Sequence, residues 1–466
     1  MVPDHIVKKL TSVQRRAGLL ITGGLQSTAG DTIDFHAGLL PVQHQISKLR
    51  HRAAVRLGTL PPTHPLHDRI RKAAREISDR RQIAHRSPVH DLLDEFSVIP
   101  DRIETQKAVR QPPNWEFKGT CRTVDAEKAT EEEQNDDADF KIYTDGSGLD
   151  GIVGAGAVLY WGEEERQTAR YRLGSLEHHE VYDGEGVGIL LGIRLARIEA
   201  REGRLRQGDR ELQTISVYVD NQAAIRALLL RRPGPSHYIW DAIHDELQKL
   251  WASYPHVRIT FRWLPAHTNI RGNERADEEA KKATTGTNLA NTMTLPELLH
   301  RTLPRNKNSL RKTHAIRLAK KWEQEWKTSP RYKRQAHFDN TTNPKQHTRL
   351  TSNMLKVHTS IIFQLRTGHI ALQHHLFRIQ KADSPMCPHC PHAETVPHYL
   401  LWCKRYDRQR KQMARDVGST RMSINHLLTR RECFPSLLRF IQNTRRLHSS
   451  FGDIPDFVDD EDFDSD

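Results

Sequence analysis

The stretch Phe140-Lys-Ile-Tyr-Thr-Asp-Gly-Ser-Gly148, with Ile152-Val-Gly-Ala-Gly-Ala-Val-Leu-Tyr-Trp161 after it, decides the fold of the middle of this chain. Apolar and polar residues alternate ahead of Asp145, as in a strand with one buried face. The second run has the β-type residues of a neighbouring strand. Gly146 to Gly151 has the spacing G-x-G-x-x-G, but a strand-like run follows it where a dinucleotide site needs a helix. The glycines therefore predict a turn.

Outward from this pair, the sequence predicts three more strands, at 168–173, 215–219 and 257–264. Helices are expected between and after them, at 181–202, 223–230, 238–251 and 272–283. Three successive strands favour antiparallel pairing, and the alternation that follows favours parallel pairing. Residues 139–285 are therefore expected to form an α/β domain with a mixed five-stranded sheet and flanking helices.

Four acids of this domain sit where a strand ends or a helix begins: Asp145, Glu185, Asp220 and Asp277. Carboxylates at neighbouring strand ends converge on one edge of a sheet, where α/β folds place their ligands. Such a group cannot stay ionised without a cation, and Mg²⁺ or Mn²⁺ is the ion that prefers oxygen ligands. Two ions about 4 Å apart would clamp the attacking and leaving oxygens of an in-line displacement at phosphorus.

The motifs around these acids resemble the successive motifs of type 1 ribonuclease H: Tyr143-Thr-Asp-Gly-Ser-Gly, Tyr182-Asp-Gly-Glu-Gly-Val-Gly-Ile, Tyr218-Val-Asp-Asn-Gln-Ala-Ala and Trp263-Leu-Pro-Ala-His-Thr-Asn-Ile-Arg-Gly-Asn-Glu-Arg-Ala-Asp. The resemblance spans roughly 139–285, and the four acids fall in the order of that family's D-E-D-D set. It implies a ribonuclease H-like fold and endonucleolytic hydrolysis of the RNA strand of an RNA–DNA hybrid, leaving 5′-phosphate and 3′-hydroxyl ends.

The resemblance also assigns roles to single residues. Asp145 would bridge two metal ions, Glu185 and Asp220 would hold one of them, and Asp277 would hold the other. His267 matches a histidine of the family that assists proton transfer or product release, a role that suits an imidazole in a loop. Four further positions match residues that touch the backbone of the hybrid: Gly146, Ser147, Asn221 and Gln222.

The Glu185 motif departs from the family pattern, because Asp183-Gly-Glu-Gly stands where many relatives have Glu-Ala-Glu-Leu. A glycine inside a helix costs about 1 kcal/mol relative to alanine. The sequence therefore leaves open whether Glu185, Asp183 or Glu180 is the metal ligand.

Charge points to a polyanionic partner. The chain has 466 residues and a net charge of +13, and its last fourteen residues hold eight acids and no Lys or Arg, which leaves +21 on the first 452. A body so basic fits nucleic acid first and an anionic membrane surface second. No apolar run is long enough for a transmembrane helix, and the first residues lack the pattern of a secretory signal.

A mean hydropathy of −0.69 and the chain length indicate several folded parts joined by polar segments. Composition divides the chain into a helical region at 1–110, an acidic linker at 111–138, the α/β domain at 139–285, a basic helical region at 286–385, a Cys/His module at 386–406, a helical region at 407–452 and an acidic, disordered tail at 453–466.

Three of the five cysteines gather with one histidine in the pattern C-x2-C-x7-H-x4-C: Cys387, Cys390, His398 and Cys403. Three thiolates and an imidazole form a closed, tetrahedral zinc set of structural type. The spacing predicts a CCHC zinc knuckle, a module that grips single-stranded nucleic acid. His389 and His392 remain possible competing ligands.

Segments outside the α/β domain resemble non-LTR retrotransposon reverse transcriptases. Val13-Gln-Arg-Arg-Ala-Gly-Leu-Leu-Ile-Thr-Gly-Gly and Ala37-Gly-Leu-Leu-Pro are similar to the region after the palm, and Leu365-Arg-Thr-Gly-His and the Cys/His segment are similar to the polyprotein tail. The resemblance implies the C-terminal part of such an element and a nuclear location within the cell. Phe457-Val-Asp-Asp matches a polymerase signature, but its acidic surroundings predict a solvated tail and no polymerase activity.

Two other functions stay open. One is a decayed remnant that binds hybrids or single strands without cutting them, which the glycines around Glu185 and the missing polymerase favour. The other is an integrase-like strand transferase, against which the order of the acids and the His267 loop argue.

Overall fold

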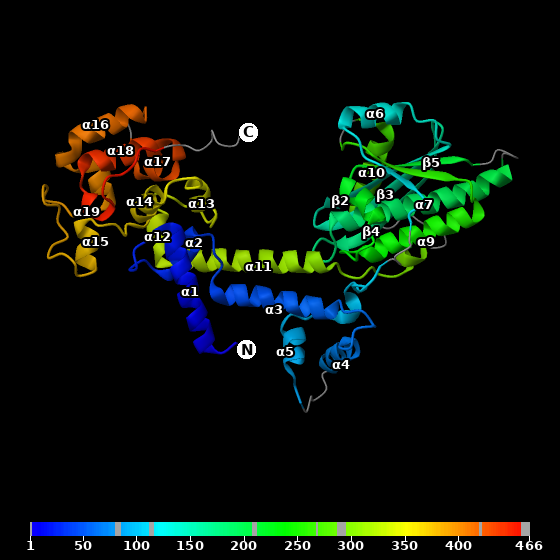
Figure 1. Ribbon diagram of the computed structural model, residues 1–466, viewed down its shortest axis with the longest axis horizontal. Coiled ribbons are helices and arrows are strands. Elements are labelled where there is room, and N and C mark those ends of the chain that lie inside the picture. The colour runs from blue at the N-terminus through cyan, green and yellow to red at the C-terminus, as the bar shows by residue number, and fades with distance from the viewer. Residues whose placement is uncertain are drawn as a thin grey trace. The chain divides into compact units, whose positions relative to one another are not determined.

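The computed structural model describes residues 2–79, 85–110, 116–206, 212–266, 269–286, 295–418 and 422–457 (Figure 1). The chain forms two compact units, which we call unit 1 (Met1–Lys48 and Ile316–Asp466) and unit 2 (Leu49–Ala315). Their boundaries fall within helices α3 (Val42–Gly58) and α11 (Lys307–Thr328). The division by composition differs, since the segments 1–110 and 286–385 each contribute to both units.

Unit 2 is built on a six-stranded mixed sheet with the strand order β1-β6-β5-β2-β3-β4. Strands β2, β3 and β4 pair antiparallel, whereas β2, β5, β6 and β1 pair parallel. This is the mixed α/β architecture that the order of strands and helices predicts. The strands are β1 (Thr120–Arg122), β2 (Phe140–Leu149), β3 (Ile152–Trp161), β4 (Glu164–Ser175), β5 (Thr214–Val219) and β6 (Arg258–Trp263).

The sixth strand lies in the segment that was expected to be a linker. Strand β1 pairs with β6 through Thr120 and Thr260, and helix α6 (Ala126–Gln134) follows it with its Ala129 buried against the sheet. Asp125 caps α6 by accepting from the backbone N–H of Lys128. A strand of three residues is too short for periodicity to reveal, and the acids of α6 look like a solvated linker although one helix face is packed.

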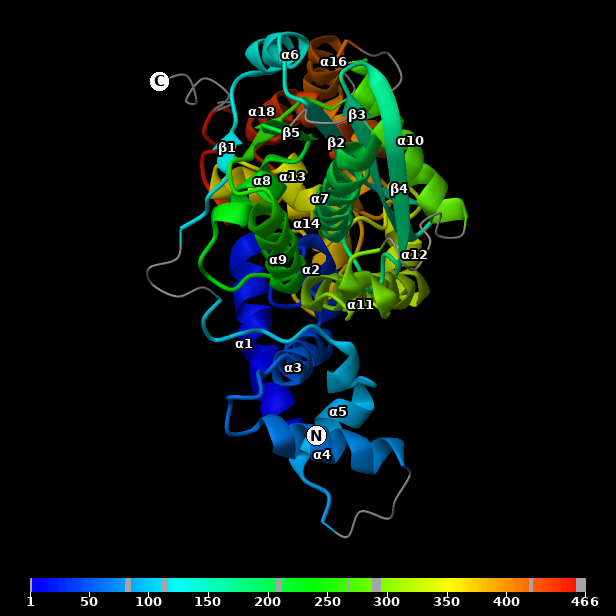
Figure 2. The ribbon, with the colours of Figure 1, turned by 90° about the vertical axis from the view of Figure 1, so that its right-hand side faces the viewer.

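Helices cover both faces of the sheet (Figure 2). On one face, α7 (Val181–Arg206), α8 (Gln222–Leu229) and α9 (His237–Ser253) bury a core that contains Ile142, Leu190 and Trp240. On the other face, α6 and α10 (Arg271–Thr285) cover residues such as Tyr143 and Tyr218. The remaining helices of unit 2 are α4 (His67–Ser78) and α5 (Pro88–Glu95).

The hairpin between β2 and β3 turns at Asp150 and Gly151, whose φ angles are +49° and +77°. Two left-handed residues of the type Asp-Gly are typical of a two-residue hairpin. The predicted turn is therefore confirmed, but β2 continues to Leu149 and Asp145 lies inside the strand, opposite Gly156 of β3. The prediction that the strand ends before Asp145 is wrong, because β2 stays paired with β3 from Phe140 to Leu149.

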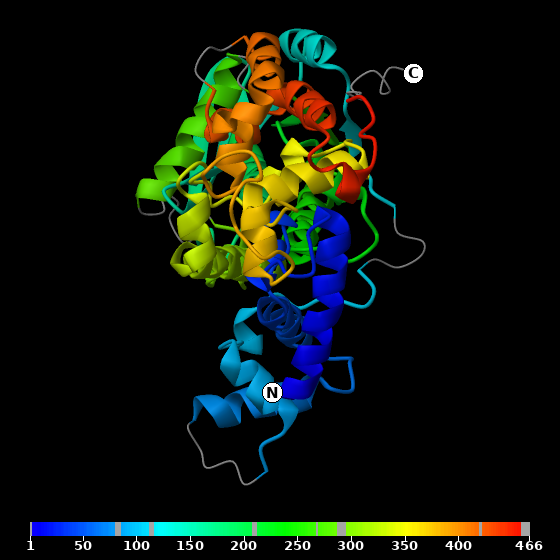
Figure 3. The same cartoon turned by 90° about the vertical axis from the view of Figure 1, so that its left-hand side faces the viewer.

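Unit 1 is helical, and segments from both ends of the chain form it (Figure 3). Phe35 stacks on Trp326 with ring centroids 4.4 Å apart, so N-terminal and C-terminal segments share a core. Its helices, with parts of α3 and α11, are α1 (Asp4–Thr22), α2 (Gly30–His36), α12 (Pro330–Gln335), α13 (Gln346–Leu350), α14 (Lys356–Thr367), α15 (Gln373–Arg378), α16 (Asp407–Asp416), α17 (Ile424–Thr429), α18 (Phe434–Thr444) and α19 (His448–Phe451).

The start of the acidic tail is folded against unit 1. Ile454 is buried, and the ring of Phe457 stacks on His358 with centroids 5.8 Å apart. Phe457 therefore serves as an apolar anchor, which differs from the predicted solvated tail, and residues 458–466 lie outside the described residues. In the described part of the chain, no helix has both the length and the apolar character needed to cross a membrane.

Close backbone packing in unit 2 yields a prediction. A Cβ atom at Gly156 would lie 2.5 Å from the carbonyl oxygen of Ala276 and from the amide nitrogen of Ala280, both in α10. We expect Gly156→Ala to lower the free energy of unfolding by about 1–3 kcal/mol, since backbone atoms cannot move aside as a side chain can. Urea titration followed by circular dichroism measures this. Gly234→Ala is the control, because a Cβ there meets nothing within 4 Å; equal stability of the two variants would contradict the prediction.

Candidate functional sites

Three of the four predicted acids converge in unit 2. Asp145 of β2, Glu185 of α7 and Asp220, which follows β5, each offer a carboxylate oxygen, and these oxygens all lie within 4.8 Å of one another. Asp145 and Glu185 are buried, whereas Asp220 is half-buried. A central strand, a crossing helix and the end of the next parallel strand therefore supply one ligand each.

Glycines allow this convergence. A Cβ atom at Gly146 would lie 2.4 Å from the amide nitrogen of Glu185, and one at Gly184 would lie 2.8 Å from the carbonyl oxygen of Gly154. At Gly186, a Cβ would come within 2.9 Å of Ile239. The glycines that looked unfavourable for a helix are thus required where α7 crosses the sheet, and the helix forms over the whole motif.

Two of the three carboxyl groups, those of Asp145 and Glu185, hold a proton more tightly than their type normally does. Burial, followed by the negative charges of Asp220 and Asp277, raises the pKa of Asp145 to about 7. Burial also raises the pKa of Glu185 well above its usual value, with Asp220 and Asp145 adding to the shift. Oxygen Oε2 of Glu185 is buried and has no hydrogen-bond partner among the described residues. This donor set therefore fits a hard divalent cation, which would relieve both the repulsion and the missing partner.

The fourth acid lies nearby but outside the group of three. Asp277 of α10 accepts from the ammonium of Lys281, with 2.6 Å between Oδ2 and Nζ, and its charge contributes to the raised pKa of Asp145. Lys281 was missed by the sequence analysis. Its spacing of four residues from an acid on the same helix was the available signal.

The alternatives to Glu185 have other surroundings. Asp183 is fully buried and accepts from Ser236 Oγ at 2.6 Å and from Asn306 Nδ2 at 2.8 Å. Its carboxylate therefore ties the start of α7 to two other segments. Glu180 is half-buried, and burial raises its pKa. Among the described residues, the carboxylate group contains neither of them.

The remaining predicted residues have mixed placements. Asn221 caps α8 by accepting from the N–H of Ala223 and Ala224, and its side chain also hydrogen-bonds Glu185. Gln222 Oε1 accepts from Arg226, and the half-buried Ser147 lies opposite Gly154 in the hairpin. His267 lies outside the described residues. Asn221 thus orients Glu185. The sequence analysis predicted that Asn221 contacts nucleic acid and did not predict this orienting role.

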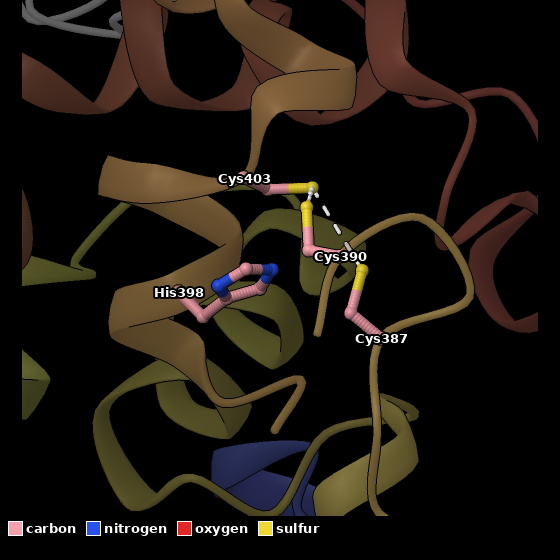
Figure 4. A group of neighbouring side chains, drawn as sticks. All are labelled: Cys387, Cys390, His398 and Cys403. Atoms are coloured by element: carbon pink, nitrogen blue, oxygen red, sulfur yellow. Dashed lines mark hydrogen bonds between the residues drawn. The ribbon is translucent and has the colours of Figure 1, made fainter. Parts of the chain in front are cut away.

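A second candidate centre lies in unit 1 and contains all four predicted ligands, Cys387, Cys390, His398 and Cys403 (Figure 4). The Sγ atom of Cys403 lies 3.9 Å from that of Cys387 and 3.8 Å from that of Cys390. Met386 and Ala393 form an antiparallel bridge at the base of the Cys-x-x-Cys turn, and a π-helical turn (His398–Trp402) presents the other two ligands.

This Cys/His centre fits a zinc ion. Burial raises the pKa of the Cys390 thiol, but the backbone N–H of Lys404 and the two neighbouring thiols outweigh it and lower that pKa, which favours a thiolate. Nitrogen Nε2 of His398 is buried and has no hydrogen-bond partner among the described residues. The grouped histidine is His398, and His389 and His392 are absent from the group that the described residues form.

The surroundings of the centre differ from those of an isolated knuckle. Cys387 and Cys403 belong to the same buried cluster as Tyr399, Leu400 and Phe440, which extends over the helices of unit 1. The Cys/His centre is therefore part of the core of a larger helical unit. Its position in sequence between two helical regions gave no indication of this packing.

Comparison with known proteins gives structural matches alone: no protein-family model and no curated protein matches the chain. The N-terminal RNase H domain of a Mycobacterium tuberculosis protein is 17% identical, with a TM-score of 0.23, over 31% of this chain and 93% of that one. RNase H1 from Halobacterium salinarum is 17% identical, with a TM-score of 0.22, over 31% and 96%. Prototype foamy virus protease–reverse transcriptase is 18% identical, with a TM-score of 0.23, over 33% and 21%.

The raised pKa of Asp145 generates a prediction about pH. An acid whose pKa is higher in the folded state than its usual 3.8 contributes stability at low pH, and this contribution is lost as pH rises through about 7. In the presence of a chelator, the stability of Asp145→Asn relative to the unmodified chain should therefore increase between about pH 4 and pH 7. Thermal unfolding across that range measures it.

Two controls accompany this measurement. Mg²⁺ should reduce the difference, because the cation replaces the proton as the partner of the carboxylate. The variant Glu278→Gln, altered at an exposed acid beside Asp277, should follow the unmodified chain at every pH. Parallel pH profiles for Asp145→Asn and the unmodified chain would refute the assignment.

The Cys/His centre generates a second prediction. We expect one zinc ion per chain, and we expect Cys403→Ser to lose it together with the fixed packing of unit 1, because the ligand lies in the core. Elemental analysis and near-ultraviolet circular dichroism report the two effects. Cys433→Ala is the matched control, since Cys433 is buried in the same cluster outside the ligand group and its removal should leave the zinc content unchanged. Retention of zinc by Cys403→Ser would contradict the ligand set.

Proposed function

We propose that the chain is a divalent-metal-dependent ribonuclease H that hydrolyses the RNA strand of RNA–DNA hybrids. The observation that carries this proposal is the convergence of Asp145, Glu185 and Asp220 within 4.8 Å, together with the raised pKa of Asp145. Three acids this close together, two of them buried and with raised pKa values, have their simplest use in holding cations. The order of the four acids along the chain, with Asp277 last, supports the assignment to ribonuclease H over other uses of such cations.

We assign each residue of the acidic site a role in holding metal or in positioning a metal ligand. Asp145, Glu185 and Asp220 would hold a Mg²⁺ or Mn²⁺ ion, and Asp145 and Asp277 are the pair that would hold a second. When bound, such ions polarise the scissile phosphate and lower the pKa of the attacking water. Asn221 holds the carboxylate of Glu185 in place through its side chain, and it also fixes the start of α8. Lys281 is the cation that now neutralises Asp277 and would have to release it for a second ion.

Specificity for a hybrid would come from contacts to the 2′-hydroxyl groups of the RNA strand. Ser147 lies one residue beyond Gly146 on the same strand as Asp145, and Gln222 follows Asn221 at the start of α8. Both are partly accessible and polar. We propose them as contacts to the backbone of the hybrid, and His267, from its place in the motif, as a residue that assists proton transfer or product release. The C-terminal part of a non-LTR retrotransposon protein is the proposed origin of the chain.

Cleavage of a hybrid with one labelled strand tests the proposed function. Asp145→Asn should reduce the rate about a thousandfold or more, since a catalytic metal supplies several kcal/mol. It should leave hybrid binding in place, because binding draws on many basic contacts. Glu278→Gln, with its exposed acid next to Asp277, is the control that should cut like the unmodified chain.

The substrate set distinguishes the alternatives. Matched DNA duplex and RNA duplex should remain uncut, and a chelator should abolish cleavage of the hybrid. Binding of hybrid without cleavage in Mg²⁺ or Mn²⁺ would establish the binding-only remnant. DNA joining without cleavage of the hybrid would establish a strand transferase.

A further inference from the structure

Unit 1 contains a cavity of about 500 Å³ that the functions discussed above do not use. Helices α2, α12, α14 and α15, the last turns of α11 and the π-helical turn next to the Cys/His centre supply its walls. The volume is in the range of pockets that hold one small organic molecule or one nucleotide. Its lining combines apolar surface with several cations, so the chemistry of a ligand can be read from the side chains.

The cavity wall carries an excess of positive charge. Arg334 and Arg378 have no carboxylate partner among the described residues, and the nearest acid to Arg331 is Asp31, at 3.7 Å. The one carboxylate of the lining, Glu394, is already held by the guanidinium of Arg446, with 2.7 Å between Oε1 and Nε. All three arginines are exposed at the rim of the cavity. Guanidinium groups gathered without close counter-charges favour an anion, and a phosphate matches their planar geometry.

Arg378 hydrogen-bonds a neutral group, so its positive charge is not compensated. Its Nη2 donates to Nε2 of His369 at 2.7 Å. Burial, followed by the neighbouring cations, lowers the pKa of His369 to about 4, so this imidazole is neutral at pH 7. Burial and the charge of Arg334 also lower the pKa of Arg378 itself. Two like charges therefore face the same space, and an anion between them would relieve their repulsion.

Two buried polar groups of the lining lack partners. Nδ1 of His36 donates to the carbonyl oxygen of Thr32, so its Nε2 is left as an acceptor, and this nitrogen has no partner among the described residues. Nε2 of Gln335 is a donor that is also unsatisfied in the described part of the chain. Both side chains are more than nine-tenths buried, with 1% and 6% exposed. The lining therefore has polar groups whose hydrogen-bonding capacity the described residues leave unused.

An exposed aromatic ring completes the lining. Trp402 is 65% exposed although it ends a π-helical turn whose first three residues are buried, and it lines the cavity together with Phe338. A large exposed aromatic side chain beside unpaired arginines is the combination with which proteins bind single-stranded nucleic acid: a base stacks on the ring and the cations hold the phosphates.

We propose that this cavity binds one unstacked nucleotide of a single-stranded nucleic acid, with its phosphate at Arg334 and Arg378 and its base against Trp402. The proposed site is the cavity beside the Cys/His centre. The four Cys/His residues of that centre do not contact the nucleic acid. A base paired in a duplex cannot enter such a cavity, so single strands are preferred over duplexes. The proposal does not depend on nuclease activity.

Fluorescence anisotropy of a labelled twelve-nucleotide oligouridylate, titrated with the full zinc-loaded chain, tests the site. Trp402→Ala should weaken binding by about tenfold or more, the loss that removal of one base–aromatic stack produces. Arg334→Ala should weaken binding and should reduce the slope of log K against log salt by about 0.7, the value for one phosphate contact on a single strand. Arg408→Ala removes an exposed cation of unit 1 that does not line the cavity, and it should bind like the unmodified chain.

Controls for folding and for nuclease activity accompany the binding measurements. Each variant must keep its zinc and its unfolding temperature, and Arg334→Lys, which keeps the charge, should retain the salt slope. Unchanged binding of Trp402→Ala and Arg334→Ala would overturn the proposal, as would binding of uridine monophosphate without binding of the oligomer. Cleavage of hybrids by the same variants should match that of the unmodified chain, because the proposed catalytic residues lie in unit 2. Failure of the nuclease and failure of this site are thus separate results.

Discussion

The close approach of two backbones is the constraint on which the acidic site depends. Helix α7 crosses strand β2 so closely that a Cβ atom at Gly146 would lie 2.4 Å from the amide nitrogen of Glu185. Glycine is the residue that permits this distance, and the distance brings the carboxylates of β2 and α7 together. Glu185 thereby becomes buried beside Asp145, and its raised pKa follows from that burial. The glycines that cost helix propensity are therefore required for the close packing that brings these acids together.

Much of this site could be predicted from the sequence, because strand and helix periodicity reveals which acids stand near element ends. The order of five strands, and the elements that carry Asp145, Glu185 and Asp220, followed from local pattern, although β2 continues past Asp145. The packing of α7 over β2 did not, since the reason for Gly184 and Gly186 lies in contacts with residues far away in sequence. The role of Asp183 was hidden for the same reason: its partners, Ser236 and Asn306, are 53 and 123 residues distant.

The Cys/His centre shows the same limit at a larger scale. Its four ligands lie within 17 residues of sequence, so their spacing alone predicted the group. The spacing contained no sign that Cys387 and Cys403 would join a core with Phe440, or that residues 1–48 would belong to the same unit. Local motifs report on ligands, whereas the surroundings of a motif depend on packing between distant segments. Strand β1, with three residues, lies below the length at which any pattern can be detected.

The four acids fall into two parts with different electrostatic surroundings: the group of three (Asp145, Glu185 and Asp220) and Asp277. Asp145, Glu185 and Asp220 share a small space, and the raised pKa of Asp145 indicates that, in the absence of metal, a proton reduces the negative charge there. Asp277 instead has Lys281 at 2.6 Å, a partner that remains charged at neutral pH. A cation entering the group of three therefore displaces protons, whereas one at Asp277 must displace an ammonium group. Since a proton leaves a carboxyl of pKa about 7 readily near neutral pH, the group of three is the half that is prepared for metal, and occupation of the second half is coupled to movement of Lys281.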